Sequence, residues 1–116
     1  MKINGIDFDV DFTDADIIEK IDEGCKKVEE ETEKLQENEN NLTPAEGIRQ
    51  ECKIIKDFLD YVFGDGTSKK LLGEKDSLVL CINTFEDIIK ARDEQVKSIE
   101  NRLNKYSPER LKRWTY

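Results

Sequence analysis

Hydrophobic residues recur at helical spacing along three long segments of the chain. The first stripe has steps of three and four residues and consists of Ile17, Ile21, Cys25, Val28, Thr32 and Leu35. Similar stripes run from Ile48 to Phe63 and from Val79 to Leu103. Such steps place side chains on one face of an α-helix. The pattern predicts helices over 14–36, 44–63 and 77–105, with residues 78–89 in the middle of the core.

Capping residues indicate where these helices begin and end. Thr43-Pro44-Ala45-Glu46 has the form of a capping box with proline at the first helical position. Thr13 is expected to cap the first helix, and Asp76 or Ser77 the third. Gly64 is expected to end the second helix, with one further helical turn over 68–72. A last short basic helix is expected from Ser107-Pro108.

The N-terminal residues alternate instead with a period of two. Ile6, Phe8, Val10 and Phe12 fall on one side, with aspartates between them. This alternation predicts a half-buried strand over 6–12. Asn4-Gly5 is a hairpin-turn dipeptide, so Lys2-Ile3 is expected to form a short return strand. A hairpin of this size needs helices to pack against.

Together these elements predict a mainly α fold with three long amphipathic helices. A chain of 116 residues fits one domain, 1–116. Within it we expect a β element over 1–12, a helical core over 13–105 and a basic tail over 106–116.

Composition argues against catalysis and against a bound metal or cofactor. Charged residues make up 40% of the chain, the net charge is −8, and there is no histidine. The commonest metal ligand and the usual general base near neutral pH are therefore missing. Asp7, Asp9 and Asp11 begin like a calcium loop, but Phe12 stands where that loop needs glycine. We therefore expect no enzyme and no cofactor.

The sequence also argues against a membrane protein and a nucleic-acid binder. The longest apolar run is Leu78–Ile82, far shorter than the roughly 20 residues of a spanning helix. The N-terminus has no hydrophobic signal segment, so we expect a cytoplasmic protein. Cys25, Cys52 and Cys81 are too scattered for a disulfide framework, and we expect reduced thiols on apolar helix faces. The acidity disfavours binding to nucleic acid.

Charge is distributed unevenly, which suggests where a protein partner would bind. Residues 1–66 carry a net charge of −11 and residues 67–116 one of +3. An acidic N-terminal surface suits a cationic partner, although an acidic face kept for solubility explains the same pattern. Cations beside a tryptophan are common at protein interfaces. The candidate partner-binding residues are Asp7, Asp9, Asp11, Asp14, Asp16, Arg110, Arg113 and Trp114.

Several short motifs resemble a family of small acidic proteins of phages and prophages of Gram-positive bacteria. The motifs are Ile3-Asn4-Gly5-Ile6-Asp7-Phe8, Phe12-Thr13-Asp14-Ala15-Asp16, Phe63-Gly64-Asp65-Gly66-Thr67-Ser68, Cys81-Ile82-Asn83-Thr84-Phe85-Glu86 and Asn104-Lys105-Tyr106-Ser107-Pro108-Glu109-Arg110. Members of this family are encoded among tail genes and are similar to tail assembly chaperones. The resemblance implies binding to the tape measure or tail tube proteins in the cytoplasm of an infected bacterial host. It assigns no functional residue.

A second function fits the same features. A phage-encoded inhibitor of a host antiviral defence system would also be small and acidic, because an acidic surface can occupy a basic nucleic-acid groove. In either case the partner is a protein. The narrow apolar stripes over 14–36 and 92–104 also need partner surfaces, so we expect a dimer or higher oligomer.

Overall fold

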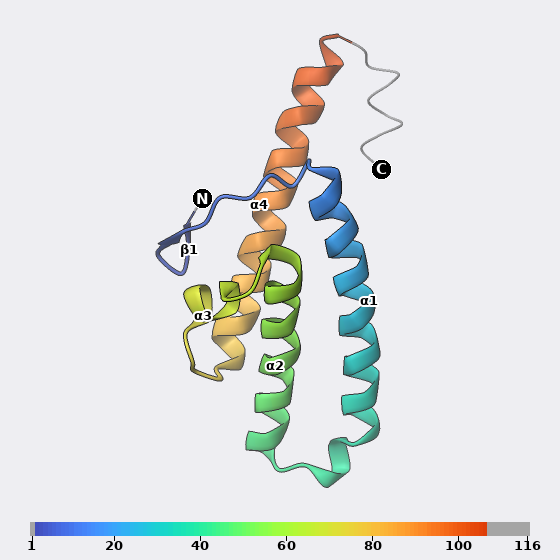
Figure 1. Cartoon of the computed structure of the whole chain (residues 1–116), viewed down its shortest axis with the longest axis vertical. Helices are drawn as coiled ribbons and strands as arrows, with labels where there is room; N and C mark the ends of the chain where they lie inside the picture. Colours follow the sequence, from blue (N-terminus) through green and yellow to red (C-terminus); the bar gives the residue numbers. More distant parts are fainter. Residues whose placement is uncertain (1, 107–116) are drawn as a thin grey trace.

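The described residues form an elongated arrangement of four α-helices, preceded by a short β-hairpin. The computed structural model describes residues 2–106, and helices make up 75% of them, which confirms a mainly α protein. The described elements are β1 (Lys2–Ile3), β2 (Ile6–Asp7), α1 (Ala15–Glu37), the 3-10 helix η1 (Glu39–Asn41), α2 (Pro44–Phe63), α3 (Thr67–Leu72) and α4 (Leu78–Asn104). Figure 1 shows α1 and α2 as an antiparallel pair, with α4 running in the direction of α2.

The predicted hairpin is present, and its turn is anchored to the helices. Asn4 and Gly5 both have positive φ, at 53° and 78°, as a tight two-residue hairpin turn requires. The Asn4 amide donates hydrogen bonds to the Leu71 carbonyl (3.1 Å) and to the Thr84 hydroxyl (2.6 Å). Thr84 in turn donates to the Leu80 carbonyl. The turn therefore joins the hairpin to α3 and α4.

The predicted strand ends earlier than its alternation suggests. Only Ile6 and Asp7 pair with β1, whereas the expected strand extends to Phe12. The following residues pair with no strand in the described part of the chain and instead cross α4 on the way to α1 (Figure 1). There the Gln95 amide accepts from the Phe12 N–H (2.9 Å) and donates to the Val10 carbonyl (2.7 Å). We call residues 2–14 the N-terminal strap.

The apolar residues of the alternating segment still face the core, as the sequence predicts. Phe8 and Phe12 are buried, Val10 is half-buried, and the aspartates between them are exposed. Phe8 and Phe12 both meet the Phe63 ring edge-on, with ring centroids 5.2 and 6.3 Å apart. This aromatic cluster stabilises the strap against the end of α2.

Helix bounds agree with the predicted spans to within one residue at each end. The Thr43–Glu46 capping box is present, Ser77 caps α4, and α2 ends before Gly64. The prediction that Thr13 caps α1 is wrong. Asp14 is the N-cap, because its carboxylate accepts from the Asp16 N–H, while the Thr13 hydroxyl donates to Asp11. The basic helix expected from Ser107 lies outside the described residues.

The core forms where α2 meets the other helices and the strap. Its buried residues are Ile3, Phe8, Phe12, Cys52, Phe58, Leu59, Val62, Leu71, Leu72, Cys81 and Ile88. The prediction that residues 78–89 lie in the middle of the core is correct for only one face of α4. Val79 is 69% exposed and Ile82 43% exposed, because α2, α3 and the strap pack on the other face of α4, which carries Cys81, Thr84 and Ile88. Cys25 is also exposed, contrary to the expected apolar packing.

Candidate functional site

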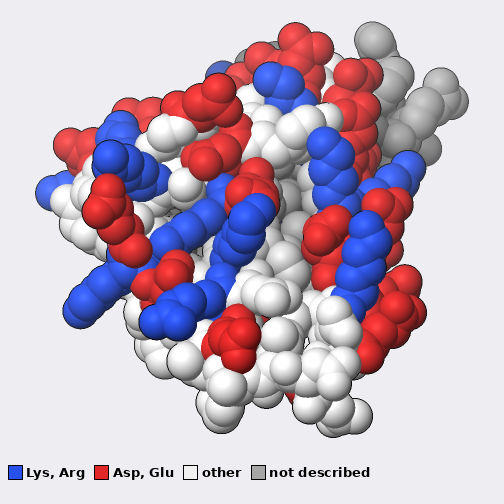
Figure 2. All heavy atoms as spheres, turned by 60° about the horizontal axis from the view of Figure 1, so that its bottom comes forward, with Lys and Arg blue, Asp and Glu red and all other residues white. Residues whose placement is uncertain are grey.

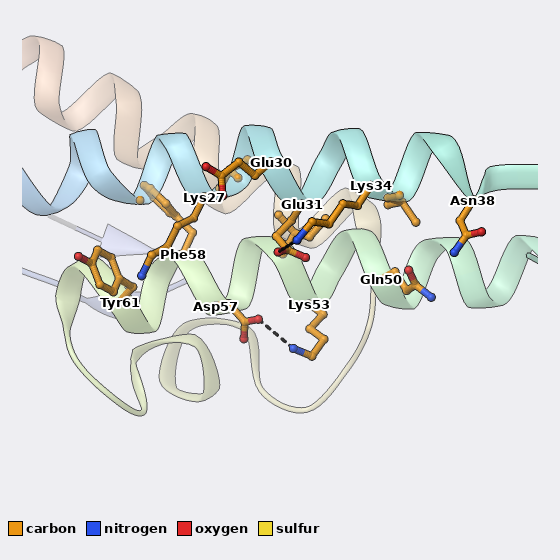
Figure 3. Close-up of a pocket in the computed structure, with 14 residues that line it drawn as sticks. Lys27, Glu30, Glu31, Lys34, Asn38, Gln50, Lys53, Asp57, Phe58 and Tyr61 are labelled. Carbon is orange, nitrogen blue, oxygen red and sulfur yellow. Dashed lines mark hydrogen bonds and ion pairs between the residues drawn. The ribbon is translucent and has the colours of Figure 1, made fainter.

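An open groove lies between α1 and α2. It has a volume of about 790 Å³, and we call it the interhelix groove. Half-buried or buried apolar side chains line its inner part, chiefly Val28, Leu35, Ile54 and Phe58. Charged and polar side chains of both helices line its edges, as Figure 3 shows.

Close packing at one end of the groove depends on a glycine. Gly24 faces Phe58 and Val62 of α2, and a Cβ at this position would lie 2.9 Å from the Phe58 ring. The absence of a side chain lets α1 approach α2 here. The groove extends from this contact toward Asn38 and Gln50 at its other end (Figure 3).

A cation–aromatic contact joins the two helices beside Gly24. The Lys27 ammonium lies 3.8 Å from the centre of the Tyr61 ring, close enough for attraction to the ring face. The Tyr61 hydroxyl donates a hydrogen bond to Glu23, which raises the pKa of Tyr61 above its ordinary value. Lys27 and Glu23 of α1 thus hold the Tyr61 side chain of α2 from two directions.

Ion pairs along the groove lie within single helices. Lys34 pairs with Glu31 at 3.5 Å on α1, and Lys53 pairs with Asp57 at 3.0 Å on α2. The hydrogen bond to Asp57 raises the pKa of Lys53. All four side chains are well exposed, so each pair adds at most about 1 kcal/mol to stability. Their charged groups stay accessible to a partner.

Positive and negative side chains alternate along the groove. Three lysines and three carboxylates line it: Lys27, Lys34, Lys53, Glu30, Glu31 and Asp57. Figure 2 shows the same interleaving of Lys and Arg with Asp and Glu over the face turned toward the viewer. No single sign of charge dominates the groove.

A second, smaller cleft lies between the strap and the C-terminal half of α4. It has a volume of about 520 Å³, and we call it the strap cleft. Its lining residues are Asp9, Val10, Asp11, Thr13, Gln95, Ser98, Ile99 and Arg102. The Gln95 hydrogen bonds to the strap place these two walls side by side.

The structure separates the predicted acidic residues into different environments. Asp9 and Asp11 line the strap cleft, whereas Asp7 lies in β2. Asp14 and Asp16 belong to the start of α1, where negative charge stabilises the helix. Asp11 accepts from both the hydroxyl and the N–H of Thr13, and these hydrogen bonds lower the pKa of Asp11. The other three candidates, Arg110, Arg113 and Trp114, lie outside the described residues.

Sequence reasoning missed the interhelix groove. Its charged residues resemble an ordinary solvated helix face, and only the approach of α2 turns them into the edges of a cleft. One signal was available: Gly24 interrupts a helix of otherwise strong formers, and such a glycine often marks close packing.

The described residues contain no group of three or more side chains able to hold a metal ion. Among the helices of residues 2–106, none has the length and apolar character needed to cross a bilayer.

The fold and the two clefts define a small, mainly α-helical protein with open surfaces between its long elements. The chain belongs to a family of unknown function (DUF6673), whose family model matches residues 4–116. Neither a curated protein nor a solved structure matches the chain.

Proposed function

We propose that this protein is a phage binding protein of the tail-assembly-chaperone type, which holds an amphipathic helix of a tape measure or tail tube protein. The observation that carries this proposal is the interhelix groove, with its apolar interior and charged edges. Laying the apolar face of a helix into such a groove is a recurring mode of peptide recognition.

The size of the groove suits a short stretch of helix. An α-helix about 10 Å across and two turns, about 11 Å, long occupies roughly 850 Å³. The groove volume of about 790 Å³ is of the same order. Two turns present two or three apolar side chains on one face, enough to cover Val28 and Ile54, the half-buried apolar residues of the groove.

The charge pattern of the interhelix groove favours binding of a helical protein segment over binding to the basic nucleic-acid groove of a host defence protein. An acidic protein that occupies a basic nucleic-acid groove needs a continuous negative surface. The interhelix groove instead carries equal numbers of lysines and carboxylates. Interleaved charges match the polar edges of an amphipathic helix and fix its register.

Capture from phage-producing cells tests this function. The tagged chain should retain the tape measure or tail tube protein encoded with it. Ile54→Glu places a charge in the apolar interior of the groove, and we expect at least a tenfold weaker interaction. Ile18→Glu is the matched control, because Ile18 is an exposed α1 residue outside the groove. Circular dichroism checks that both variants remain helical.

Two results would contradict the proposal. One is equal capture of the tail protein by wild type and Ile54→Glu, which would remove the groove from the interaction. The other is specific capture of a host defence protein in place of any tail protein, which would favour the inhibitor function.

A further inference from the structure

The strap cleft has chemistry suited to a basic segment with an apolar side chain. Val10 and Ile99 are half-buried and supply apolar lining, while Asp9 and Asp11 lie on the strap side. Among the described residues that line the cleft, Asp9 and Asp11 are acidic and Arg102 is basic. Both hydrogen bonds from Thr13 go to Oδ1 of Asp11. A carboxylate has acceptor sites beyond these two.

The chain itself contains a segment of matching composition, which follows α4 in the sequence. Residues 107–116 carry Arg110, Lys112 and Arg113 against Glu109 alone, together with Trp114, the only tryptophan. The strap carries four aspartates against one lysine. The two segments therefore have opposite net charge, +2 and −3.

The segment starts close enough to the cleft to reach it. Ser98, on the α4 wall, lies six residues before the end of the helix, about 9 Å along the axis. Ten residues extend up to about 33 Å, so a segment that turns back from the end of α4 spans this distance easily. The family match also includes this segment, since it runs to residue 116.

We infer that residues 107–116 dock in the strap cleft of the same chain, with the basic side chains beside Asp9 and Asp11 and Trp114 against the apolar lining. This contact joins the two ends of the chain over the C-terminal half of α4. It is independent of the interhelix groove and of the proposed function.

Trp114 provides a direct probe of this contact in the full-length protein. At low salt we expect its emission to lie to the blue of free N-acetyltryptophanamide and its quenching by acrylamide to be reduced. Raising NaCl from about 0.1 M to about 1 M shortens the Debye length from about 10 Å to about 3 Å. The emission should then shift to the red and quenching should increase, without loss of helix.

Paired charge reversals localise the contact. Asp9→Lys/Asp11→Lys should expose Trp114 at low salt. The control Asp7→Lys/Asp16→Lys changes the net charge by the same amount, on exposed residues outside the cleft, and should leave Trp114 protected. Should the first variant lose helix, Asp9→Asn/Asp11→Asn keeps an acceptor for Thr13 and should still weaken protection.

Three outcomes would overturn the inference. Trp114 could be fully quenchable in the wild type at low salt. Both charge-reversal pairs could expose it equally, which would indicate a general field rather than a site. Protection could disappear on dilution from tens of micromolar to below one micromolar, which would assign the cleft to the segment of a second copy.

Discussion

Individual polar side chains hold the loops of this protein against its helices. Asn4 links the hairpin turn to Leu71 and Thr84, and the Lys56 ammonium donates to both the Lys75 carbonyl and Asp76 before α4. Thr43 and Glu46 satisfy backbone N–H groups at the start of α2. Each contact replaces a hydrogen bond to water. Its removal therefore leaves a specific polar group exposed to water or without a hydrogen-bond partner.

Removal of the Thr43 hydroxyl tests the capping box. Thr43→Ala takes away the acceptor of the Glu46 N–H, and we expect the free energy of unfolding to fall by about 1 kcal/mol. Urea denaturation followed by circular dichroism measures the change. Thr32→Ala makes the same chemical change inside α1, away from any cap, and should cost nothing or stabilise slightly. Equal losses in both variants would contradict the capping role.

The three cysteines should differ sharply in reactivity. Cys25 is exposed, whereas Cys52 and Cys81 have no exposed surface, so a disulfide reagent should label one thiol in the folded protein and three after denaturation. Partial desolvation, together with the nearby Asp22 carboxylate, raises the pKa of Cys25, whereas burial together with Cys52 raises that of Cys81 to about 11. A raised pKa leaves less thiolate, so labelling of the exposed Cys25 should accelerate as the pH rises above about 8.

A serine at position 25 is the control for the labelling experiment. Cys25→Ser should remove the fast phase of labelling and leave the two slow thiols. Fast labelling of this variant would show that a buried thiol is accessible.

At the scale of the elements, helix packing determines where the interhelix groove opens and where the strap lies. The α1–α2 pair approaches closely at Gly24, and the groove opens beyond that point. Beyond β2 the strap pairs with no strand of the described chain, and one α4 side chain, Gln95, supplies hydrogen bonds to the backbone of Val10 and Phe12.

Two glycine-to-alanine changes should act in opposite directions. Gly24→Ala forces a methyl group against the Phe58 ring, an overpacking cost of about 1–3 kcal/mol that exceeds the helix-propensity gain of up to about 1 kcal/mol. Gly47→Ala meets no atom within 4 Å, so the propensity gain should stabilise the protein by about 0.5–1 kcal/mol. Thermal and urea unfolding of both variants measure the difference. Stabilisation by Gly24→Ala would refute close contact there.

Gln95 should control how firmly the strap is held. Gln95→Ala removes the partners of the Phe12 N–H and the Val10 carbonyl, and we expect a loss of about 1–3 kcal/mol. In Gln95→Ala, hydrogen exchange at the Phe12 backbone amide should accelerate more than exchange in α2. Gln36→Ala, an exposed site on α1, should change neither quantity. Unchanged exchange in Gln95→Ala would contradict the amide clamp.

At the scale of the whole molecule, the first part of α4 is buried on one face and leaves apolar side chains exposed on the other. Ile17, Ile21 and Val28 of the α1 stripe pack, partly buried, against the core of their own chain. Val79 and Ile82 lie exposed one turn apart at the start of α4, and apolar residues so placed favour burial against a partner.

We expect the protein to form a dimer or higher oligomer through this part of α4. Light scattering at tens of micromolar should give a mass above the 13.5 kDa of one chain. Val79→Lys/Ile82→Lys should return the mass to that of a monomer. Gln36→Lys/Asn40→Lys adds the same charge at exposed polar positions and should leave the oligomer intact. A monomer mass for the wild type would reject the prediction.

Local sequence was sufficient for the helix bounds and for the hairpin turn. Capping and periodicity act between residues three or four positions apart, so Thr43, Glu46 and Gly64 bound α2 whatever surrounds it. The Asn4-Gly5 turn likewise predicts its hairpin, because positive φ at both positions is a property of those residues.

Only the tertiary structure decided which faces meet and where clefts remain. The strap is held against α4 because the side chain of Gln95, more than 80 residues away in sequence, forms hydrogen bonds with the strap backbone. No local sequence pattern encodes that contact. Val79 is exposed and Cys81 buried because neighbouring elements cover one side of α4 alone. The interhelix groove arises in the same way, since helical periodicity predicts an apolar stripe but not how completely a second helix will cover it.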